Sequence, residues 1–400
     1  MRIIRRARTA IGIDVGTRNI KAAQLCRSDG QYHIAALLLL PRVKLAEQVD
    51  REEILSLRGS LRRQGFCGND IVLAAPDEKL LRGILELPGR VSGAAVRQMA
   101  RMELSRLHHA APDSFELVHW EPASADKSKP TTQTLAFGCP HDVANAYLDA
   151  FEEAGLNVTA LDVRSAAAVR ACLPLTAPPP AVTCLLDLEW NSTKLLLVWG
   201  HTLIYEKFIS NKCIATLTVR LSEKFGLPER SAYQIVRAVG LPPRPFLLPK
   251  EARGQGEAAG TAFDINSSEL DPKSVEAIRK MLMSHFDTVA EELKTPLAYA
   301  GQQYPDKGIE RILLTGDGAG ILGISQYLAD NLGIEVMPAA PSDIVAPAPR
   351  RLGRGEPVLT KAGNPDLTVA VGLAKFAARP GDPSGRSLPE HEGQDRSGGE

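Results

Sequence analysis

The stretch IGIDVGTRNIK, residues 11–21, decides how the rest of this sequence is interpreted. An apolar segment ends there at an aspartate, and a second apolar segment begins a few residues later. We expect strands at residues 9–14 and 20–25, joined by a tight turn that contains Gly16. The turn would bring one carboxylate and several polar groups to the same end of a strand pair.

This turn has the residue types that hold a nucleotide phosphate. The Asp14 carboxylate can hold a hydrated Mg²⁺, and Gly16 lets the backbone come close to a phosphate. The backbone N–H groups and the hydroxyl of residues 17–19 can donate to phosphate oxygens, and Lys21 can offset the phosphate charge. An ordinary hairpin turn without a ligand is the alternative.

The segment LDLEWNST, residues 186–193, repeats this layout near the middle of the chain. It also runs from an apolar strand through an aspartate and a polar turn into a returning strand. Asp187 follows Asp14 by 173 residues, so each aspartate lies near the start of one half. Two related halves that face each other across a cleft would explain the repeat, and chance similarity of two short hairpins is the alternative.

A third candidate lies in RILLTGDGAGILG, residues 311–323, where a strand runs through glycines into a helix. Residues 318–323 match G-x-G-x-x-G, and Glu335 follows Gly318 by 17 residues, which is close to a dinucleotide fingerprint. However, no βαβαβ half follows these glycines. The same residues suit a turn against which an adenine or a ribose rests, or a tight turn without a ligand.

The composition indicates a globular protein of about two to three domains, because the chain has 400 residues and 44% of them are hydrophobic. Lys+Arg and Asp+Glu number 47 each, and this zero net charge argues against nucleic acid as a partner. The longest apolar run, residues 34–40, is too short for a membrane span. Cysteine and histidine spacings predict neither a zinc site nor a disulfide framework, so we expect a cytoplasmic protein.

Strands alternate with helices along the chain, which predicts an α/β fold. The segment LTVAVGLAKF, residues 367–376, adds a helix of small residues suited to close packing on a sheet. The other helices are expected at residues 47–65, 93–108, 143–154, 165–172, 215–225, 229–239, 275–299 and 321–332.

The order of these motifs resembles that of the actin-like ATPases. More narrowly, it resembles the PilM family of type IV pilus assembly, which is related to the cell-division protein FtsA. The resemblance covers roughly residues 9–378 and depends on several weak segments in the right order. They are IGIDVGTRNIKAAQL (11–25), LELPGRVSGAAVRQMARMELSRL (85–107), YLDAFEEAGLNVTALDVRSAAAVRA (147–171), RILLTGDGAGILGISQYLADNLGIEV (311–336) and LTVAVGLAKFA (367–377).

The resemblance implies an actin-like ATPase fold, in which two RNase-H-like halves hold ATP and Mg²⁺ in the cleft between them. Asp14 and Asp187 would be the catalytic carboxylates, and Asp14 would also hold the metal. The nucleotide would be bound by Gly16, Thr17, Arg18, Asn19 and Lys21 in a first phosphate segment, by Thr193 in a second, and by Gly316, Asp317, Gly318 and Ala319 in an adenosine segment.

The resemblance also divides the chain into domains. Residues 1–90, completed by 155–180 and 365–378, would form the first half, and residues 181–345 the second, with a helical subdomain at 215–300. Residues 91–154 would be a small inserted subdomain, which in this family helps to bind the cytoplasmic N-terminal peptide of the inner-membrane protein PilN. Residues 379–400 have almost no large apolar residues and are expected to form a disordered tail.

The second phosphate segment departs from the family pattern. The family has Asp-x-Gly there, whereas this chain has Asp187-Leu188-Glu189, and Asn211-Lys212 replaces a later Gly-Gly. A carboxylate about 4 Å from a phosphate costs about 1 to 4 kcal/mol, depending on the local dielectric constant. We therefore expect the binding of ATP and Mg²⁺, and any ATPase activity, to be weakened or lost.

The leading functional hypothesis is a scaffold of type IV pilus assembly or a related secretion machine. It would be cytoplasmic and recruited to the inner face of the cell membrane by its peptide partner, and both ATP gating and homo-oligomer formation stay open. One alternative is a sugar-kinase-like phosphotransferase, for which no motif names a catalytic base. Another is an NAD-binding oxidoreductase built on residues 318–323.

Overall fold

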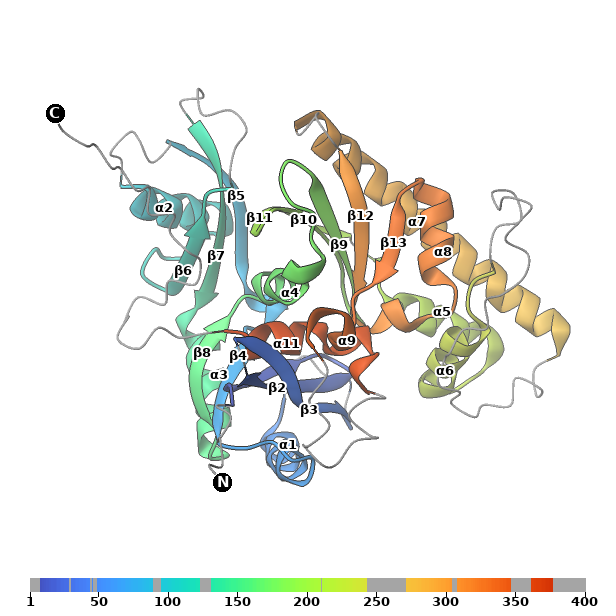
Figure 1. The fold of residues 1–400 in the computed structure, drawn as a ribbon, viewed down its shortest axis with the longest axis horizontal. Helices are drawn as coiled ribbons and strands as arrows, with labels where there is room; N and C mark the ends of the chain where they lie inside the picture. Colours follow the sequence, from blue (N-terminus) through green and yellow to red (C-terminus); the bar gives the residue numbers. More distant parts are fainter. Residues whose placement is uncertain are drawn as a thin grey trace.

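The computed structural model describes residues 8–28, 30–43, 45, 49–88, 95–122, 131–209, 211–242, 271–303, 308–346 and 361–376. Within these residues the chain forms three β-sheets with helices between and around them (Figure 1). The tail expected at residues 379–400 lies outside the described residues.

The two larger sheets have the same strand order. They run β3-β2-β1-β4-β8 and β11-β10-β9-β12-β13, and in each an antiparallel three-stranded meander is followed by two parallel strands. The similarity of the two hairpin sequences is therefore part of a repeat of whole half-domains. The strands are β1 Ile11–Val15, β2 Asn19–Ser28, β3 Gln31–Pro41, β4 Asp70–Ala74, β8 Asn157–Asp162, β9 Val182–Leu188, β10 Thr193–Trp199, β11 Thr202–Ile209, β12 Ile309–Thr315 and β13 Glu335–Pro338.

Two helices, α4 (Arg164–Cys172) and α11 (Thr368–Ala374), lie between the two larger sheets (Figure 1). Their small residues permit this close packing. A Cβ on Gly372 would lie 1.8 Å from the Ala167 carbonyl oxygen, and one on Gly12 would lie 2.2 Å from the Ala370 carbonyl oxygen. The glycines therefore let α11 press against both α4 and β1, which places the start of α4 beside the first hairpin.

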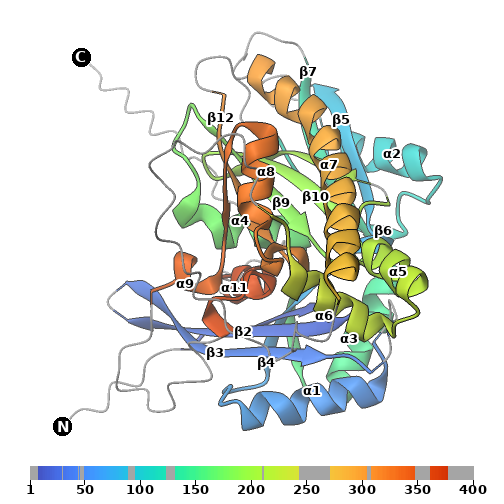
Figure 2. The same cartoon turned by 90° about the vertical axis from the view of Figure 1, so that its right-hand side faces the viewer.

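Other helices cover the outer faces of the two sheets (Figure 2). Helices α1 and α3 bury their apolar faces on the first sheet, and α5 to α8 do so on the second. The helices are α1 Arg51–Arg63, α2 Val96–His108, α3 His141–Glu153, α5 Ile214–Phe225, α6 Glu229–Val239, α7 Pro272–Gln303, α8 Ile324–Leu332 and α9 Pro341–Ile344.

The inserted subdomain is built on a third sheet of order β5-β7-β6, with β5 Leu81–Pro88, β6 Phe115–Trp120 and β7 Thr131–Pro140. Helix α2 covers one face of this sheet. On the other face Trp120 stacks on Phe137 at 5.2 Å and donates a hydrogen bond to the Leu203 carbonyl at 2.9 Å, which joins the insert to the second half.

The boundary expected at residue 91 requires correction, because β5 already belongs to the third sheet. Leu85 and Leu87 of β5 pack beneath α2 rather than in the core of the first half. The family resemblance placed the boundary at residue 91, whereas strand pairing with β7 assigns β5 to the insert.

Most expected helices occur within a few residues of their predicted bounds, whereas some strands were not predicted. The apolar run at residues 34–40 lies in β3, which pairs with β2 along its whole length. Strand β11 was missed because its residues are only partly buried and show no clear alternation. Among the described residues, no helix combines the length and the apolar character needed to cross a bilayer.

Candidate functional site

The two hairpins carry the same pair of residues in the same register. Asp14 of β1 lies opposite Lys21 of β2, and Asp187 of β9 lies opposite Lys194 of β10. All four residues are almost completely buried. The pseudo-repeat therefore places two buried aspartate–lysine pairs at the junction of the two halves, which is where the sequence predicted a cleft.

Lys21 is surrounded by three carboxylates. Its Nζ donates to both carboxylate oxygens of Glu189 at 2.7 and 2.8 Å, and lies 2.8 Å from Asp366 and 3.4 Å from Asp14. Asp14 and Asp366 come from the first half, whereas Glu189 comes from the turn between β9 and β10. Lys21 thus connects the first half to the turn of the second half.

Arg164 is the second cation at this junction. It is the first residue of α4 and is 6% exposed. Its guanidinium donates to Asp14 at 3.1 Å and to Glu189, and its Nε lies 3.5 Å from Asp187. A single side chain therefore reaches the aspartates of both hairpins, which fixes their separation.

The pKa values of these groups follow from burial and from the opposite charges around them. Burial alone would raise the pKa of Glu189, but Arg164 and Lys21 outweigh it and lower this pKa to about 2. Burial would likewise lower the pKa of Lys21, but Asp366, Glu189 and Asp14 raise it well above its usual value. Glu189 and Lys21 are consequently both charged at neutral pH.

Asp366 differs from the other carboxylates of the cluster. Burial raises its pKa to about 7, Lys21 offsets this only in part, and Asp317 and Glu189 add to the rise. The Asn19 amide also donates to Asp366, at 3.4 Å. Because carboxylates outnumber cations around Lys21, the least stabilised carboxylate takes up a proton near neutral pH.

The turns of the two hairpins contact each other directly. The Asn191 side-chain amide donates to the Thr17 hydroxyl at 2.8 Å, and Gly16 and Glu189 line the same small cavity. The cavity left between the turns has a volume of about 30 Å³. Pockets for ligands of drug size occupy roughly 300 to 1,000 Å³, so the triphosphate implied by the resemblance does not fit between these turns.

The place expected for a nucleoside is occupied by Arg18. Its guanidinium lies 3.4 Å from the ring centroid of Tyr233 and 5.1 Å from that of Trp190, and it pairs with Asp317 at 3.3 Å. The Tyr233 hydroxyl donates to Asp317, and burial together with Asp317 raises the pKa of Tyr233 well above its usual value. The aromatic faces are therefore already stacked on a side chain of the chain itself.

The glycines of the third candidate segment serve packing. A Cβ on Gly318 would lie 2.6 Å from an Ile214 side-chain carbon, and one on Gly320 would lie 2.4 Å from the Arg237 guanidinium. Gly316 has φ +81°, and its Cβ would lie 2.8 Å from the Leu188 carbonyl oxygen. These contacts bring the turn against β9, α5 and α6, so protein atoms already lie beside each of the three glycines.

The structure brings most of the predicted site residues together, but in ion pairs and packing contacts. Asp187 accepts from the Thr315 hydroxyl at 2.9 Å, and Thr193 donates to the Lys212 carbonyl at 2.7 Å. Ala319 is buried beside them. Within the described part of the chain, no group of acidic, histidine or cysteine side chains is arranged to hold a metal ion, and Asp14 instead faces Arg164 and Lys21. The donor set thus does not fit Mg²⁺.

Charges of opposite sign face each other across the junction. The first half and the insert contribute mostly cations, and the second half contributes mostly carboxylates. The cross-junction pairs are Arg18–Asp317, Lys21–Glu189, Arg164–Glu189, Arg164–Asp187, Arg82–Glu206 and, with the signs reversed, Asp77–Lys194. The cations of these pairs are thus already neutralised by carboxylates, and the pairs hold the two halves together directly.

Sequence reasoning missed Arg164, Asp366 and Tyr233. An arginine before the run Ser165-Ala-Ala-Ala is unusual on a buried small-residue helix, and this was an available signal for Arg164. Asp366 and Tyr233 gave no such signal, because each is brought to the junction by helices remote in sequence from the hairpins.

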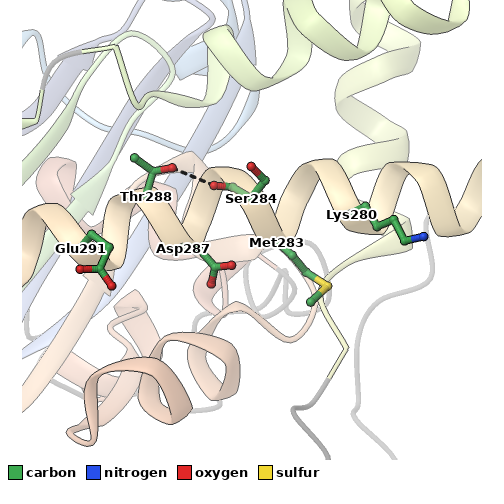
Figure 3. A pocket seen from close by; sticks show the side chains of 6 residues that line it. All are labelled: Lys280, Met283, Ser284, Asp287, Thr288 and Glu291. Carbon is green, nitrogen blue, oxygen red and sulfur yellow. Dashed lines mark hydrogen bonds between the residues drawn. The ribbon is translucent and has the colours of Figure 1, made fainter.

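A separate cavity lies away from the junction, on the flank of α7. It has a volume of about 450 Å³, and Figure 3 shows its lining side chains along one face of this helix. Asp287 is already engaged by the Tyr327 hydroxyl at 2.7 Å. A groove lined by a single helix takes no part in the junction. Its residues are Lys280, Met283, Ser284, Asp287, Thr288 and Glu291.

The chain was compared with known proteins by sequence and by structure. No protein-family model matches the sequence, and no curated protein matches it. The structure is similar to the PilM-PilN type IV pilus biogenesis complex, with a TM-score of 0.68 and 19% identity over 92% of this chain and 97% of that chain. This similarity confirms the expected fold class, an actin-like ATPase fold, and confirms the resemblance to PilM at the level of structure.

Two further solved structures are less similar. The ethanolamine utilization protein EutJ from Carboxydothermus hydrogenoformans has a TM-score of 0.47 and 13% identity, over 93% of this chain and 90% of that chain. MreB5 of Spiroplasma citri bound to AMPPNP has a TM-score of 0.46 and 14% identity, over 92% of this chain and 95% of that chain.

Proposed function

We propose that this protein is a scaffold of type IV pilus assembly or a related secretion machine. It binds the cytoplasmic N-terminal peptide of an inner-membrane protein that takes the place of PilN in the PilM-PilN complex. This binding holds it at the inner face of the membrane. The observation that carries this proposal is the similarity to the PilM-PilN complex, which extends over 97% of the matched chain.

The insert is the part of the chain best suited to hold a peptide. Its apolar side chains are unusually exposed, with Ile84 of β5 at 42% and Met102 of α2 at 53%. Met side chains adapt to different apolar partners, and an extended peptide can add main-chain hydrogen bonds at a sheet edge such as β5. The insert therefore offers exposed apolar side chains and, within the described residues, a strand at the edge of its sheet.

The junction of the halves supports a scaffold rather than an enzyme. The cavity between the hairpin turns is too small for a triphosphate, and Arg18 covers the aromatic faces beside it. We therefore propose that peptide binding proceeds without ATP or Mg²⁺. The proposed function therefore does not include the ATP gating that the sequence left open.

A pull-down with synthetic N-terminal peptides of candidate inner-membrane pilus proteins tests this function. We expect one peptide to bind the full chain, and Ile84→Glu or Met102→Glu to weaken its binding about tenfold or more, as for a central apolar contact. Val219→Glu is a matched control, because Val219 of α5 is 41% exposed but lies outside the insert. Unchanged binding to both insert variants would contradict the proposed site.

A further inference from the structure

Glu189 lies in a turn of the second half but forms ion pairs with two cations of the first half. Both of its carboxylate oxygens accept from Lys21, at 2.7 and 2.8 Å, and one also accepts from Arg164. Both cations are buried, Lys21 at 1% exposed and Arg164 at 6%. Two buried cations from β2 and α4 thus converge on one carboxylate that belongs to the other half.

The turn holds this carboxylate in place. The Glu189 backbone N–H donates to the Ser192 carbonyl at 2.8 Å, which closes the turn between β9 and β10. Its carbonyl accepts from the Ile214 N–H at 3.5 Å, at the start of α5. Because the backbone is fixed on both sides, the side chain is delivered to the cations as a preorganised group, and little conformational entropy is lost when it binds them.

We propose that Glu189 is a built-in anionic ligand, which occupies an oxyanion site formed by Lys21 and Arg164 and keeps the two halves closed without any bound anion. This goes beyond the proposed function, because it concerns the chemistry of the junction and not the peptide. It also reinterprets the expected repulsion: Glu189 does not merely repel a phosphate but takes the position between the cations that a phosphate oxygen would need.

The proposal predicts a latent anion site. Removal of the Glu189 side chain would leave a hole that Lys21 and Arg164 face, while Lys21 keeps Asp14 and Asp366 and Arg164 keeps Asp14 and Asp187. This hole adjoins the cavity of about 30 Å³ lined by Arg164 and Glu189. A small oxyanion such as inorganic phosphate matches it, since its oxygens can accept from an ammonium and a guanidinium at once. The wild-type chain offers phosphate no such space.

Thermal unfolding of the full chain in inorganic phosphate, against chloride at equal ionic strength, tests this inference. We expect Glu189→Ala to lower the Tm in chloride, and millimolar phosphate to raise the Tm of the variant by about 5 °C or more beyond any rise in the wild type. Glu116→Ala is the matched control, because Glu116 forms an exposed ion pair with Arg97, and its Tm should follow that of the wild type in both buffers.

Two further measurements keep the inference testable if Glu189→Ala does not fold. Glu189→Gln fills the hole but carries no charge, so we expect a lower Tm than that of the wild type and no extra gain in phosphate. Wild-type protein should show no Tm shift with Mg-ATP. The proposal would be overturned if Glu189→Gln had the same Tm as the wild type. It would also be overturned if Glu189→Ala folded but was not stabilised by phosphate, or if Mg-ATP clearly shifted the Tm of the wild type.

A successful phosphate rescue does not depend on the peptide partner. If the rescue succeeds and no pilus peptide binds, the proposed function fails and the internal ligand stands. If a peptide binds and the rescue fails, the reverse holds.

Discussion

The two hairpins of this protein have the same strand register and the same aspartate–lysine pair, but their turns differ in sequence. Asp14 faces Lys21 in the first, and Asp187 faces Lys194 in the second, with the same spacing along the chain. Two residues after each aspartate, the first hairpin has Gly16 and the second has Glu189. A glycine leaves an open turn, whereas a glutamate supplies a charge that crosses to the other half.

This difference changes the surroundings of the two lysines. Lys21 contacts Asp14, Glu189 and Asp366, whereas Lys194 contacts Asp77 at 2.7 Å and Asp187 at 3.8 Å. Both residues contacted by Lys194 have another cation nearby, Arg82 for Asp77 and Arg164 for Asp187. The two lysines at equivalent positions are therefore expected to contribute unequally to the free energy of unfolding.

The largest expected effect distinguishes these two lysines. Lys21→Met should lower the free energy of unfolding by about 3 to 5 kcal/mol, because it removes the ion pair of buried Asp366 and leaves Arg164 to offset both Asp14 and Glu189. Lys194→Met should cost at least about 1 kcal/mol less, because Asp77 keeps Arg82 and Asp187 keeps Arg164. Urea unfolding of both variants gives the comparison directly. Equal losses would show that Glu189 and Asp366 add nothing to the first hairpin.

The next effect is a pH dependence that comes from Asp366. Its folded pKa of about 7 lies above the ordinary value of 3.8, so stability falls as pH rises from about 4 through 7. Asp366→Asn removes this loss. From pH 5 to pH 8, the free energy of unfolding of the variant should rise relative to that of the wild type by about 1 to 3 kcal/mol, since one pKa unit corresponds to about 1.4 kcal/mol.

Measurements at pH 5 and above keep this test specific. The pKa values of Glu189 and Asp77 are lowered to about 2, and their stabilising contributions are lost only as pH falls below about 4.5. A constant difference between Asp366→Asn and the wild type across this pH range would contradict the raised pKa of Asp366.

The smallest expected effect concerns the contact between the turns. Asn191→Ala removes the hydrogen bond from its amide to the Thr17 hydroxyl, which lies in an exposed position. We expect a loss of about 0.5 to 1 kcal/mol, typical of a solvent-accessible hydrogen bond. A loss above about 2 kcal/mol in urea unfolding would mean that the turns, and not the buried ions, hold the halves together.

Much of the fold follows from local sequence patterns. The aspartate-bearing hairpins, the glycine turn at residues 311–323 and the small-residue helix near the end are local signals in a recurring order. The start of the insert was misplaced because β5 joins its sheet by pairing with β7, which lies about 50 residues away in the chain. Long-range pairing of this kind leaves no local signal.

The sequence by itself indicated the two halves, the aspartates at the strand ends and the unusual Glu189, because each depends on residue type and short spacing. The tertiary structure alone decided what Glu189 does. Lys21 and Arg164 are 168 and 25 residues away from it, and the packing of α4 and α11 between the sheets brings all three together. From its sequence, Glu189 was expected to repel a ligand; in the folded chain two buried cations make it a partner that joins the halves.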